Sequence, residues 1–237
     1  MMKINDPDAY HTSEEQDVID SLLELRDARV LELGCGSAWM TRLLAERFAP
    51  EHIVATEVDR IQHDKNLALA DELPNVSFRF GGAETIDDPD DTYDRVFMFK
   101  SLHHVPGELM GRALQEIHRV LKPGGLAYFS EPVYWGPFNE LLRHIHDEKL
   151  VREAAFEALR CAVDEGLFEL RAEVFFQVPG TYETWEIFDD RFLKVTHTEL
   201  DMDAERYAKV RGLFYRHLTP TGAHFLKPHR VDLLRKC

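Results

Sequence analysis

The segment that most constrains the fold is a short apolar run that breaks into glycines, residues 30–39, VLELGCGSAW. Four residues with the character of a buried strand precede Gly34-Cys35-Gly36, and a helical pattern then runs from Trp39 to Phe48. Glycines let the backbone approach a bound molecule closely, and a helix N-terminus presents unpaired N–H groups. The segment therefore predicts a ligand-binding turn between a strand and a helix.

Strand-like and helix-like segments alternate from residue 28 to residue 131. The predicted strands are apolar runs at residues 28–33, 52–57, 75–80, 93–99 and 126–130, and the predicted helices are 39–48, 60–72 and 107–121. Alternation of this kind predicts an α/β fold with a mostly parallel sheet and helices on both faces. Because ligands of such sheets bind outside the carboxyl ends of the strands, we expect the loops after successive strands to converge on one crevice.

The 237 residues fit a single domain with three parts better than two independent domains. We expect an N-terminal arm and helix at 1–27, a ligand-binding core at 28–133, and a lid or substrate region with the last strands at 134–237. Ser13 and Gln16 form a capping box, which predicts that the first helix has Ser13 as its N-cap. Within the third part, the apolar pattern predicts helices in 138–165 and 204–217 and strands at 167–178 and 225–234.

The formal net charge of -15 argues against nucleic acid and anionic membrane surfaces as partners, since both are bound by clustered Lys and Arg. A neutral or cationic small molecule is the partner that this charge balance favours. Cys35, Cys161 and Cys237 have no disulfide or metal-ligand spacing, and the polar N-terminus has no signal-peptide pattern. We therefore expect a cytoplasmic protein without a membrane segment, and the sequence leaves its oligomeric state open.

The residues around the glycines disfavour one nucleotide-binding motif, that of a dinucleotide oxidoreductase, and exclude another. A dinucleotide-binding loop has the pattern Gly-x-Gly-x-x-Gly, whereas this chain has Trp39 at the third glycine position. A phosphate-binding P-loop is excluded because no Gly-Lys-Ser/Thr follows. Glu32 adds a positive indication, since a carboxylate near the end of a buried strand is rare unless it is paired or used. Its charge favours a ligand with a positive centre.

An ordered series of short motifs carries a resemblance to a known family. The motifs are Glu32-Leu33-Gly34-Cys35-Gly36-Ser37-Ala38, Glu57, Ala83-Glu84, Tyr93-Asp94-Arg95-Val96, Leu102-His103-His104-Val105 and Leu121-Lys122-Pro123-Gly124-Gly125. Through them, residues 28–131 resemble the class I S-adenosylmethionine-dependent methyltransferases of the small-molecule type. The resemblance implies a Rossmann-like class I methyltransferase fold with a C-terminal lid, S-adenosyl-L-methionine as cofactor and S-adenosyl-L-homocysteine as product. Two departures are Ala38 in place of a third glycine and Gly82 where the family often has an acid or amide.

The resemblance also implies a role in cofactor binding for each matching residue. The loop Gly34-Cys35-Gly36 would wrap the methionine part, Glu32 would hold its amino group, and Glu57 would accept both ribose hydroxyls. Val58 would pack on the adenine, Ala83 and Glu84 would recognise its edge, and Lys100 and Ser101 would approach the methionine end. The alternative for Glu57 is a solvated N-cap of the following helix.

Candidate catalytic residues follow the fourth and fifth predicted strands. Histidine titrates near neutral pH, so His104, His103 or else Tyr134 would serve as general base for an oxygen acceptor. The alternative for both histidines is a hydrogen-bonded wall beside the cofactor. No metal site is predicted, because the spacings of the remaining candidate histidines match no ligand motif: His197, His217, His224 and His229.

The predicted function is transfer of a methyl group from S-adenosylmethionine to a small-molecule acceptor by in-line displacement. The alternative is a non-catalytic module that binds S-adenosylmethionine or S-adenosylhomocysteine as a regulatory or partner subunit. The sequence leaves open the acceptor and whether O, N, S or C is methylated. Aromatic residues of the third part are expected to form its core rather than a cage for a cation: Trp135, Phe138, Tyr182, Trp185 and Phe188.

Overall fold

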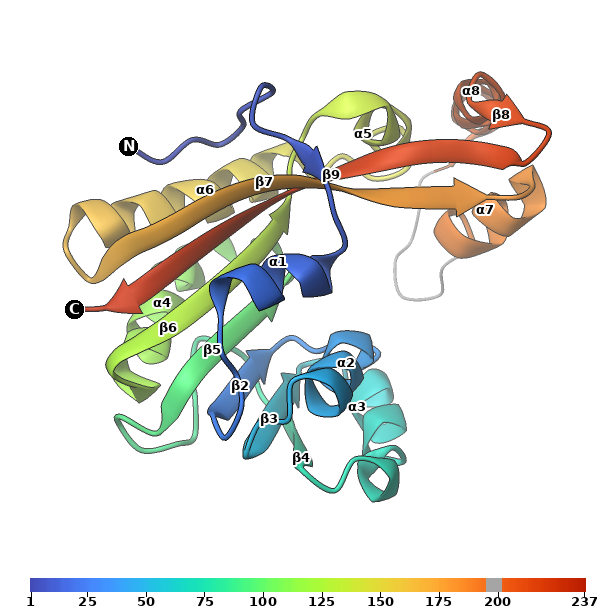
Figure 1. Cartoon of the computed structure of the whole chain (residues 1–237). Helices are drawn as coiled ribbons and strands as arrows, with labels where there is room; N and C mark the ends of the chain where they lie inside the picture. Colours follow the sequence, from blue (N-terminus) through green and yellow to red (C-terminus); the bar gives the residue numbers. More distant parts are fainter. Residues whose placement is uncertain (195–201) are drawn as a thin grey trace.

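A single sheet of nine strands organises the computed structural model, which describes residues 1–194 and 202–237 (Figure 1). The strand order is β1-β7-β9-β6-β5-β2-β3-β4, and β8 pairs with β9. The strands are β1 (His11–Thr12), β2 (Arg29–Leu33), β3 (His52–Glu57), β4 (Val76–Phe80), β5 (Tyr93–Phe99), β6 (Leu121–Pro132), β7 (Phe168–Tyr182), β8 (Leu218–Thr219) and β9 (Gly222–Lys236). From β4 through β6 all neighbours are parallel, whereas β9 runs antiparallel to β6, β7 and β8. The predicted mostly parallel α/β sheet is confirmed.

Helices cover both faces of this sheet (Figure 1). They are α1 (Glu15–Leu22), α2 (Trp39–Arg47), α3 (Arg60–Leu67), α4 (Gly107–Val120), α5 (Gly136–Leu142), α6 (Lys149–Asp164), α7 (Trp185–Phe192) and α8 (Ala204–Tyr215), with short 3-10 turns η1 (Ala70–Glu72) and η2 (Leu102–His104). One hydrophobic cluster joins α4 and α6 to the sheet, and a second joins α1 and α2 to the opposite face. Strand β2 is buried between them, since Val30 and Leu31 are fully buried but belong to opposite clusters.

The strand order reverses its direction between β2 and β5. From β2 the chain moves outward through β3 to β4, then returns to pair β5 on the other side of β2 before it continues to β6. In open α/β sheets a crevice forms at such a switch point, outside the carboxyl ends of the strands. The glycine loop after β2 and the turn η2 after β5 both lie at this position.

Strands β7 and β9 form a long antiparallel pair that runs from the sheet into a separate cluster of helices (Figure 1). Their pairing extends from Phe168↔Lys236 to Tyr182↔Ala223. At the far end, α5, α7 and α8 pack around a third hydrophobic cluster. This cluster contains four of the five aromatic residues expected in a core, Phe138, Tyr182, Trp185 and Phe188. Trp135 instead stacks on Tyr10, with ring centroids 4.9 Å apart.

Two local predictions are wrong for reasons of tertiary pairing. The N-cap of α1 is Glu14, without a side-chain cap, rather than Ser13. Strand β1 pairs with β7, and the Ser13 N–H donates to the Gln177 carbonyl at 3.2 Å, so Ser13 stays in the extended segment before the helix. Strand β6 begins at Leu121, earlier than the predicted residue 126, because Leu121 already pairs with β5 before a register shift.

No helix in the two described ranges has the length and apolar character that a membrane crossing requires.

Candidate functional site

A cavity of about 740 Å³ lies at the carboxyl ends of β2, β3 and β5, and we call it the first cavity. Its wall comes from the loops after β2, β3, β4 and β5. All ten residues predicted to bind the cofactor line it: Glu32, Gly34, Cys35, Gly36, Glu57, Val58, Ala83, Glu84, Lys100 and Ser101. The structure thus brings together residues spread over about 70 positions of the sequence, as expected from ligands binding at strand carboxyl ends.

The glycine loop is held tightly against its neighbours. The N–H groups of Gly34 and Cys35 donate to the Thr56 carbonyl at 3.0 and 2.9 Å, which fixes the loop to β3. Gly34 has a φ of +72°, and a Cβ at this position would lie 2.8 Å from the Ser101 Cβ. Only glycine combines this backbone conformation with so close an approach. The loop therefore lines the cavity with backbone rather than with side chains.

Glu32 is a buried carboxylate without a complete set of partners. Its side chain is 1% exposed, and its Oε2 accepts no hydrogen bond from the described residues. Burial raises the pKa of Glu32 to about 8, and the Thr41 hydroxyl offsets this only in part. A buried acid of this kind is costly to ionise unless a positive group or a donor reaches it. Since Glu32 lines the first cavity, such a group can come from a ligand.

Glu57 organises the backbone at the end of β3. Its Oε2 accepts from the Gly36 N–H at 2.8 Å, and its Oε1 accepts from the N–H groups of Val58 and Asp59 at 2.8 and 2.9 Å. The N-cap of α3 is Asp59, whose carboxylate accepts from Ile61 and Gln62. Capping is thus carried out by Asp59, and Glu57 faces the cavity.

The opposite rim of the first cavity contains Gly82, one of the two departures from the family pattern. A Cβ at this position would collide with the Glu84 carboxylate. Glycine at residue 82 therefore makes room for the Glu84 side chain beside Ala83, and all three residues line the cavity. At the mouth, Val58 and Trp39 are 60% and 61% exposed, so apolar surface is available to a planar ligand.

The predicted catalytic residues occupy different positions. His104 lines the first cavity, whereas His103 is buried and donates through its Nδ1–H to the Glu131 carboxylate at the end of β6. The other Glu131 oxygen accepts from the Leu102 N–H at 2.9 Å, so Glu131 fixes η2. Burial and the neighbouring His103 lower the pKa of His104, which favours its neutral form. Tyr134 is half-buried and lines neither this cavity nor the second one described below.

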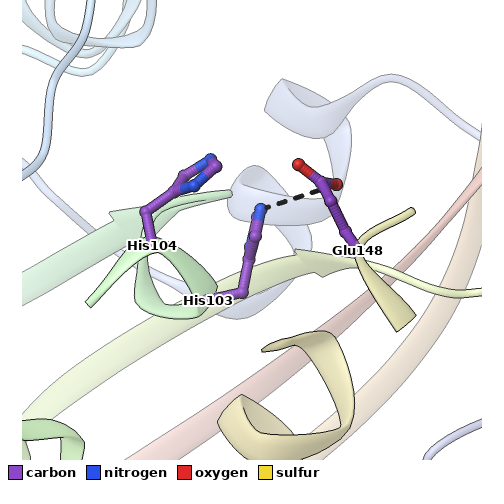
Figure 2. Close-up of side chains that lie close together, drawn as sticks. All are labelled: His103, His104 and Glu148. Carbon is purple, nitrogen blue, oxygen red and sulfur yellow. Dashed lines mark ion pairs between the residues drawn. The ribbon is translucent and has the colours of Figure 1, made fainter. Parts of the chain in front are cut away.

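A cluster of groups able to bind a metal also lies at η2. In Figure 2 the Nε2 of His103 faces Glu148, at 4.0 Å from its Oε2, and His104 lies beside it. Their ligand atoms all lie within 4.8 Å of one another. Arg152 already pairs with Glu148, with Nη2 2.5 Å from Oε2. Of the four histidines judged from their spacing, His197 lies outside the described residues.

A second cavity of about 350 Å³ adjoins the first and shares Lys100 and His104 with it. Its other lining residues are His103, Pro132, Val133, Phe138, Asn139, Leu142, Glu148, Arg152, Val178, Tyr182, Arg191, Phe192, Lys227, Pro228 and His229. The sequence predictions missed most of these residues as site residues. They come from β6, α5, α6, β7, α7 and β9 and the adjoining loops, and no local motif connects them.

Comparisons with known proteins match the part of the chain that lines the first cavity. Residues 30–125 match the family model of the methyltransferase domain. The chain is 32% identical over 125 residues to the chloroplastic 2-methyl-6-phytyl-1,4-hydroquinone methyltransferase 2 of Oryza sativa subsp. japonica. This alignment covers 50% of the chain and 35% of the rice protein. The first curated relatives are matched over only part of their length, 35% in the rice protein and 57% in the Geobacillus kaustophilus demethylmenaquinone methyltransferase.

Solved structures share the whole fold at low sequence identity. The YcgJ protein from Bacillus subtilis has a TM-score of 0.66 and 18% identity, with 93% of this chain and 97% of that chain covered. A SAM-dependent methyltransferase from Methanosarcina mazei has a TM-score of 0.59 and 16% identity, with 95% and 99% covered. Residues 30–125 therefore match a methyltransferase domain, and the chain as a whole has the same fold as these two solved proteins.

Proposed function

We propose that this protein transfers a methyl group from S-adenosyl-L-methionine to a small-molecule acceptor and releases S-adenosyl-L-homocysteine. The observation that carries the proposal is the first cavity, in which a buried, unpaired carboxylate oxygen of Glu32 lies beside a glycine loop. The names of the curated relatives, which describe methylation of hydroquinone and menaquinone compounds, support a small-molecule acceptor.

The residues around Glu32 fit the amino-acid end of this cofactor. A positively charged α-amino group would provide the partner that Glu32 Oε2 lacks, and it would favour the ionised carboxylate. The close contact between Gly34 and Ser101 keeps side chains out of the space beside Glu32. In our proposal Gly34, Cys35 and Gly36 enclose this end, and Lys100 and Ser101 border it from β5.

The nucleoside end of the cofactor is assigned to the rim between β3 and β4. Each Glu57 oxygen already accepts from backbone N–H groups and retains acceptor capacity, so the carboxylate would hold the two ribose hydroxyls in a fixed direction. Val58 would pack on the adenine, and Ala83 and Glu84 would contact its edge. The exposure of Val58 supports the stacking role.

Bound S-adenosylmethionine supplies a methyl group that is already activated on a sulfonium, so the protein's own residues act mainly by positioning and by excluding water. Lys100 and His104 border both cavities, which supports acceptor binding in the second cavity. The lowered pKa of His104 leaves its ring neutral near pH 7, able to accept a proton from an oxygen acceptor. Glu131 would act as a positioning residue through His103, and Tyr134 is a weaker candidate because it lines neither cavity.

The domain division and the cellular location also belong to the proposal. We assign residues 1–27 to an arm and helix, 28–133 to cofactor binding, and 134–237 to the acceptor side and the last strands. A cytoplasmic, reducing location is supported by three free cysteines, two of them exposed.

The experiment is transfer of labelled methyl from S-adenosylmethionine to the small-molecule fraction of a cell extract by purified protein. We expect a labelled product together with stoichiometric S-adenosylhomocysteine, both lost in a Glu57→Ala variant. Calorimetric binding of S-adenosylhomocysteine without any transfer would instead support the non-catalytic regulatory module. Absence of binding would contradict both functions.

A further inference from the structure

The second cavity has a charge that is opposite to that of the whole protein. Its lining contains four basic side chains, Lys100, Arg152, Arg191 and Lys227, and one acidic side chain, Glu148. The chain as a whole has a formal net charge of -15. In a protein of net negative charge, a cavity lined by basic groups still has a positive local electrostatic potential, which attracts anions. The lining therefore selects against cations and for anions.

The single acid of the second cavity is already neutralised. Arg152 pairs with Glu148 at 2.5 Å, and the Nε2 of His103 lies 4.0 Å from the same carboxylate oxygen. Among the described residues, no acidic group lies within ion-pair distance of Lys100, Lys227 or Arg191. Glu14 and Glu15 act on these lysines only from a distance and line neither cavity. Three cations thus face the cavity without a direct counter-ion.

These three cations are close enough to repel one another. Burial lowers the pKa of Lys227, and the charges of Lys100 and Arg191 lower it further. Lys227 lies across Gly180 of β7, where a Cβ would be 3.0 Å from the lysine Cε. Lys100 has a φ of +55°, a left-handed conformation that is strained for a residue with a side chain. Such an arrangement is unfavourable by itself and becomes favourable with an anion between the cations.

Aromatic groups form another part of the wall, and Arg191 lies beside two of them, with its Cζ 6.0 Å from the Tyr182 ring centroid and 5.7 Å from that of Phe192. Phe138 and Tyr182 lie parallel, with an interplanar angle of 1° and ring centroids 6.0 Å apart, and Phe192 packs against both. All three rings line the second cavity. The cavity thus offers an aromatic surface and a cationic end, within about 350 Å³. A molecule with an apolar body and one anionic group matches both features.

We propose that the second cavity binds the methyl acceptor through an oxyanion group, a carboxylate or phosphate held by Lys227, Arg191 and Lys100, with the apolar body of the acceptor against Phe138, Tyr182 and Phe192. This assignment rests on the proposed methyl transfer. It replaces the neutral or cationic acceptor expected from net charge. The same field disfavours a divalent cation at His103, His104 and Glu148 (Figure 2), whose carboxylate is also occupied by Arg152.

The test measures binding to the second cavity directly, without turnover. Naphthoate, naphthyl phosphate, neutral naphthamide and cationic naphthylmethylammonium are titrated by calorimetry into the full chain saturated with S-adenosylhomocysteine, in buffer with EDTA. We expect the two anions to bind at least about tenfold more tightly than the amide, because hydrogen bonds to charged groups are the stronger ones. The relative affinity of the carboxylate and the phosphate identifies which anion the site prefers. The ammonium compound is expected not to bind.

Variants locate the anion. Lys227→Gln and Arg191→Gln should each weaken naphthoate binding by about tenfold and leave naphthamide unchanged. Lys149→Gln is the matched control, since this exposed lysine lines neither cavity and pairs with Glu153. Unchanged S-adenosylhomocysteine affinity in all three variants reports that the fold and the first cavity are intact.

Three results would overturn the proposal: equal binding of amide and anion, unchanged naphthoate binding in both cavity variants, or anion binding that appears only when EDTA is replaced by a divalent metal. The last result would assign the anion to a metal at His103, His104 and Glu148. If S-adenosylhomocysteine itself fails to bind, the proposed function fails instead, so the two failures are distinguishable.

Discussion

Gly34 and Ser101 meet at the base of the first cavity, where a Cβ on Gly34 would lie 2.8 Å from the Ser101 Cβ. Ser101 has no freedom to move away, because its hydroxyl donates to the Leu33 carbonyl at 2.8 Å and its side chain is buried. The backbone of the loop after β2 therefore packs directly against a side chain of the loop after β5. Cofactor binding in our proposal depends on this contact.

Gly34→Ala should weaken S-adenosylhomocysteine binding by at least about tenfold, since it combines a left-handed φ with a collision against a fixed side chain. Gly124→Ala is the matched control: its φ is +75°, nothing lies within 4 Å of its Cβ position, and Gly124 lines neither cavity. The control should lose about 1 kcal/mol of stability from backbone strain and retain most of its affinity. Calorimetric titration and thermal unfolding of both variants measure the difference. Equal losses in affinity would show that the contact with Ser101 is unimportant.

Glu57→Gln should also weaken S-adenosylhomocysteine binding by about tenfold or more, because an amide nitrogen cannot accept hydrogen bonds from the N–H groups that Glu57 now binds. Asp59→Asn is the control, since Asn also caps helices well and Asp59 does not line the first cavity. Binding by calorimetry should separate the two variants. Near-normal affinity of Glu57→Gln would contradict the ribose assignment.

The buried Glu32 predicts a pH dependence of stability in the ligand-free protein. Its pKa is raised to about 8, above the ordinary value of 4.5, so the folded state holds a proton that the unfolded state releases. This contribution is complete below pH 4.5 and is lost as the pH rises towards 8, with a slope of up to about 1.4 kcal/mol per pH unit. The stability of the Glu32→Gln variant should not fall in this way, because glutamine does not ionise. Denaturant unfolding of both proteins should show the variant gaining relative stability from pH 5 to pH 8.

The same group predicts proton release on cofactor binding. If the positive amino group of the cofactor stabilises ionised Glu32, binding at pH 7 should release up to one proton, seen as a dependence of the calorimetric heat on the ionisation enthalpy of the buffer. Glu32→Gln should abolish this dependence. A wild-type heat independent of the buffer would show that Glu32 stays neutral in the complex.

His104→Ala should lower turnover on an oxygen acceptor by about 100-fold while changing S-adenosylhomocysteine affinity little, because general bases typically contribute factors of this size. His118→Ala is the control, since His118 packs on Phe168 and lines neither cavity. Initial rates with the acceptor from the extract experiment measure the effect. A rate loss restored by raising the pH would support a base role. Unchanged turnover would leave His104 with a wall role only.

The sequence predicted the core of the sheet because its signals are local. Strands β3 and β5 were predicted with the bounds that the structure shows, since each contains a run of three consecutive buried apolar residues, 53–55 in β3 and 96–98 in β5. The ten residues predicted to bind the cofactor lie at or just after the carboxyl ends of strands, so an ordered set of motifs predicted that they would line one cavity. The capping box at Ser13 failed because the pairing of β1 with β7, a contact distant in sequence, decided the local conformation.

The second cavity was beyond sequence reasoning for a related reason. Lys100, Arg152, Arg191 and Lys227 are separated by long stretches of chain, and none lies in a motif. The net charge favoured a neutral or cationic ligand, because it sums the charges of the whole chain. The four basic residues, by contrast, lie together in one cavity. The pairing of β7 with β9, which brings Lys227 beside Gly180, also has no local signal.

Strands β7 and β9 are continuous from the central sheet to the aromatic wall of the second cavity (Figure 1). Lys227 and Tyr182 therefore lie on paired strands whose backbone hydrogen bonds form when the protein folds. In our proposal these bonds are already present before the acceptor binds. The entropic cost of ordering that wall is met during folding, so less of the binding free energy is lost on entry of the acceptor. In the proposed function, substitutions at the far end of this strand pair would change acceptor choice independently of the glycine loop. Acceptor selectivity and methyl-donor binding would then be separable traits of one sheet.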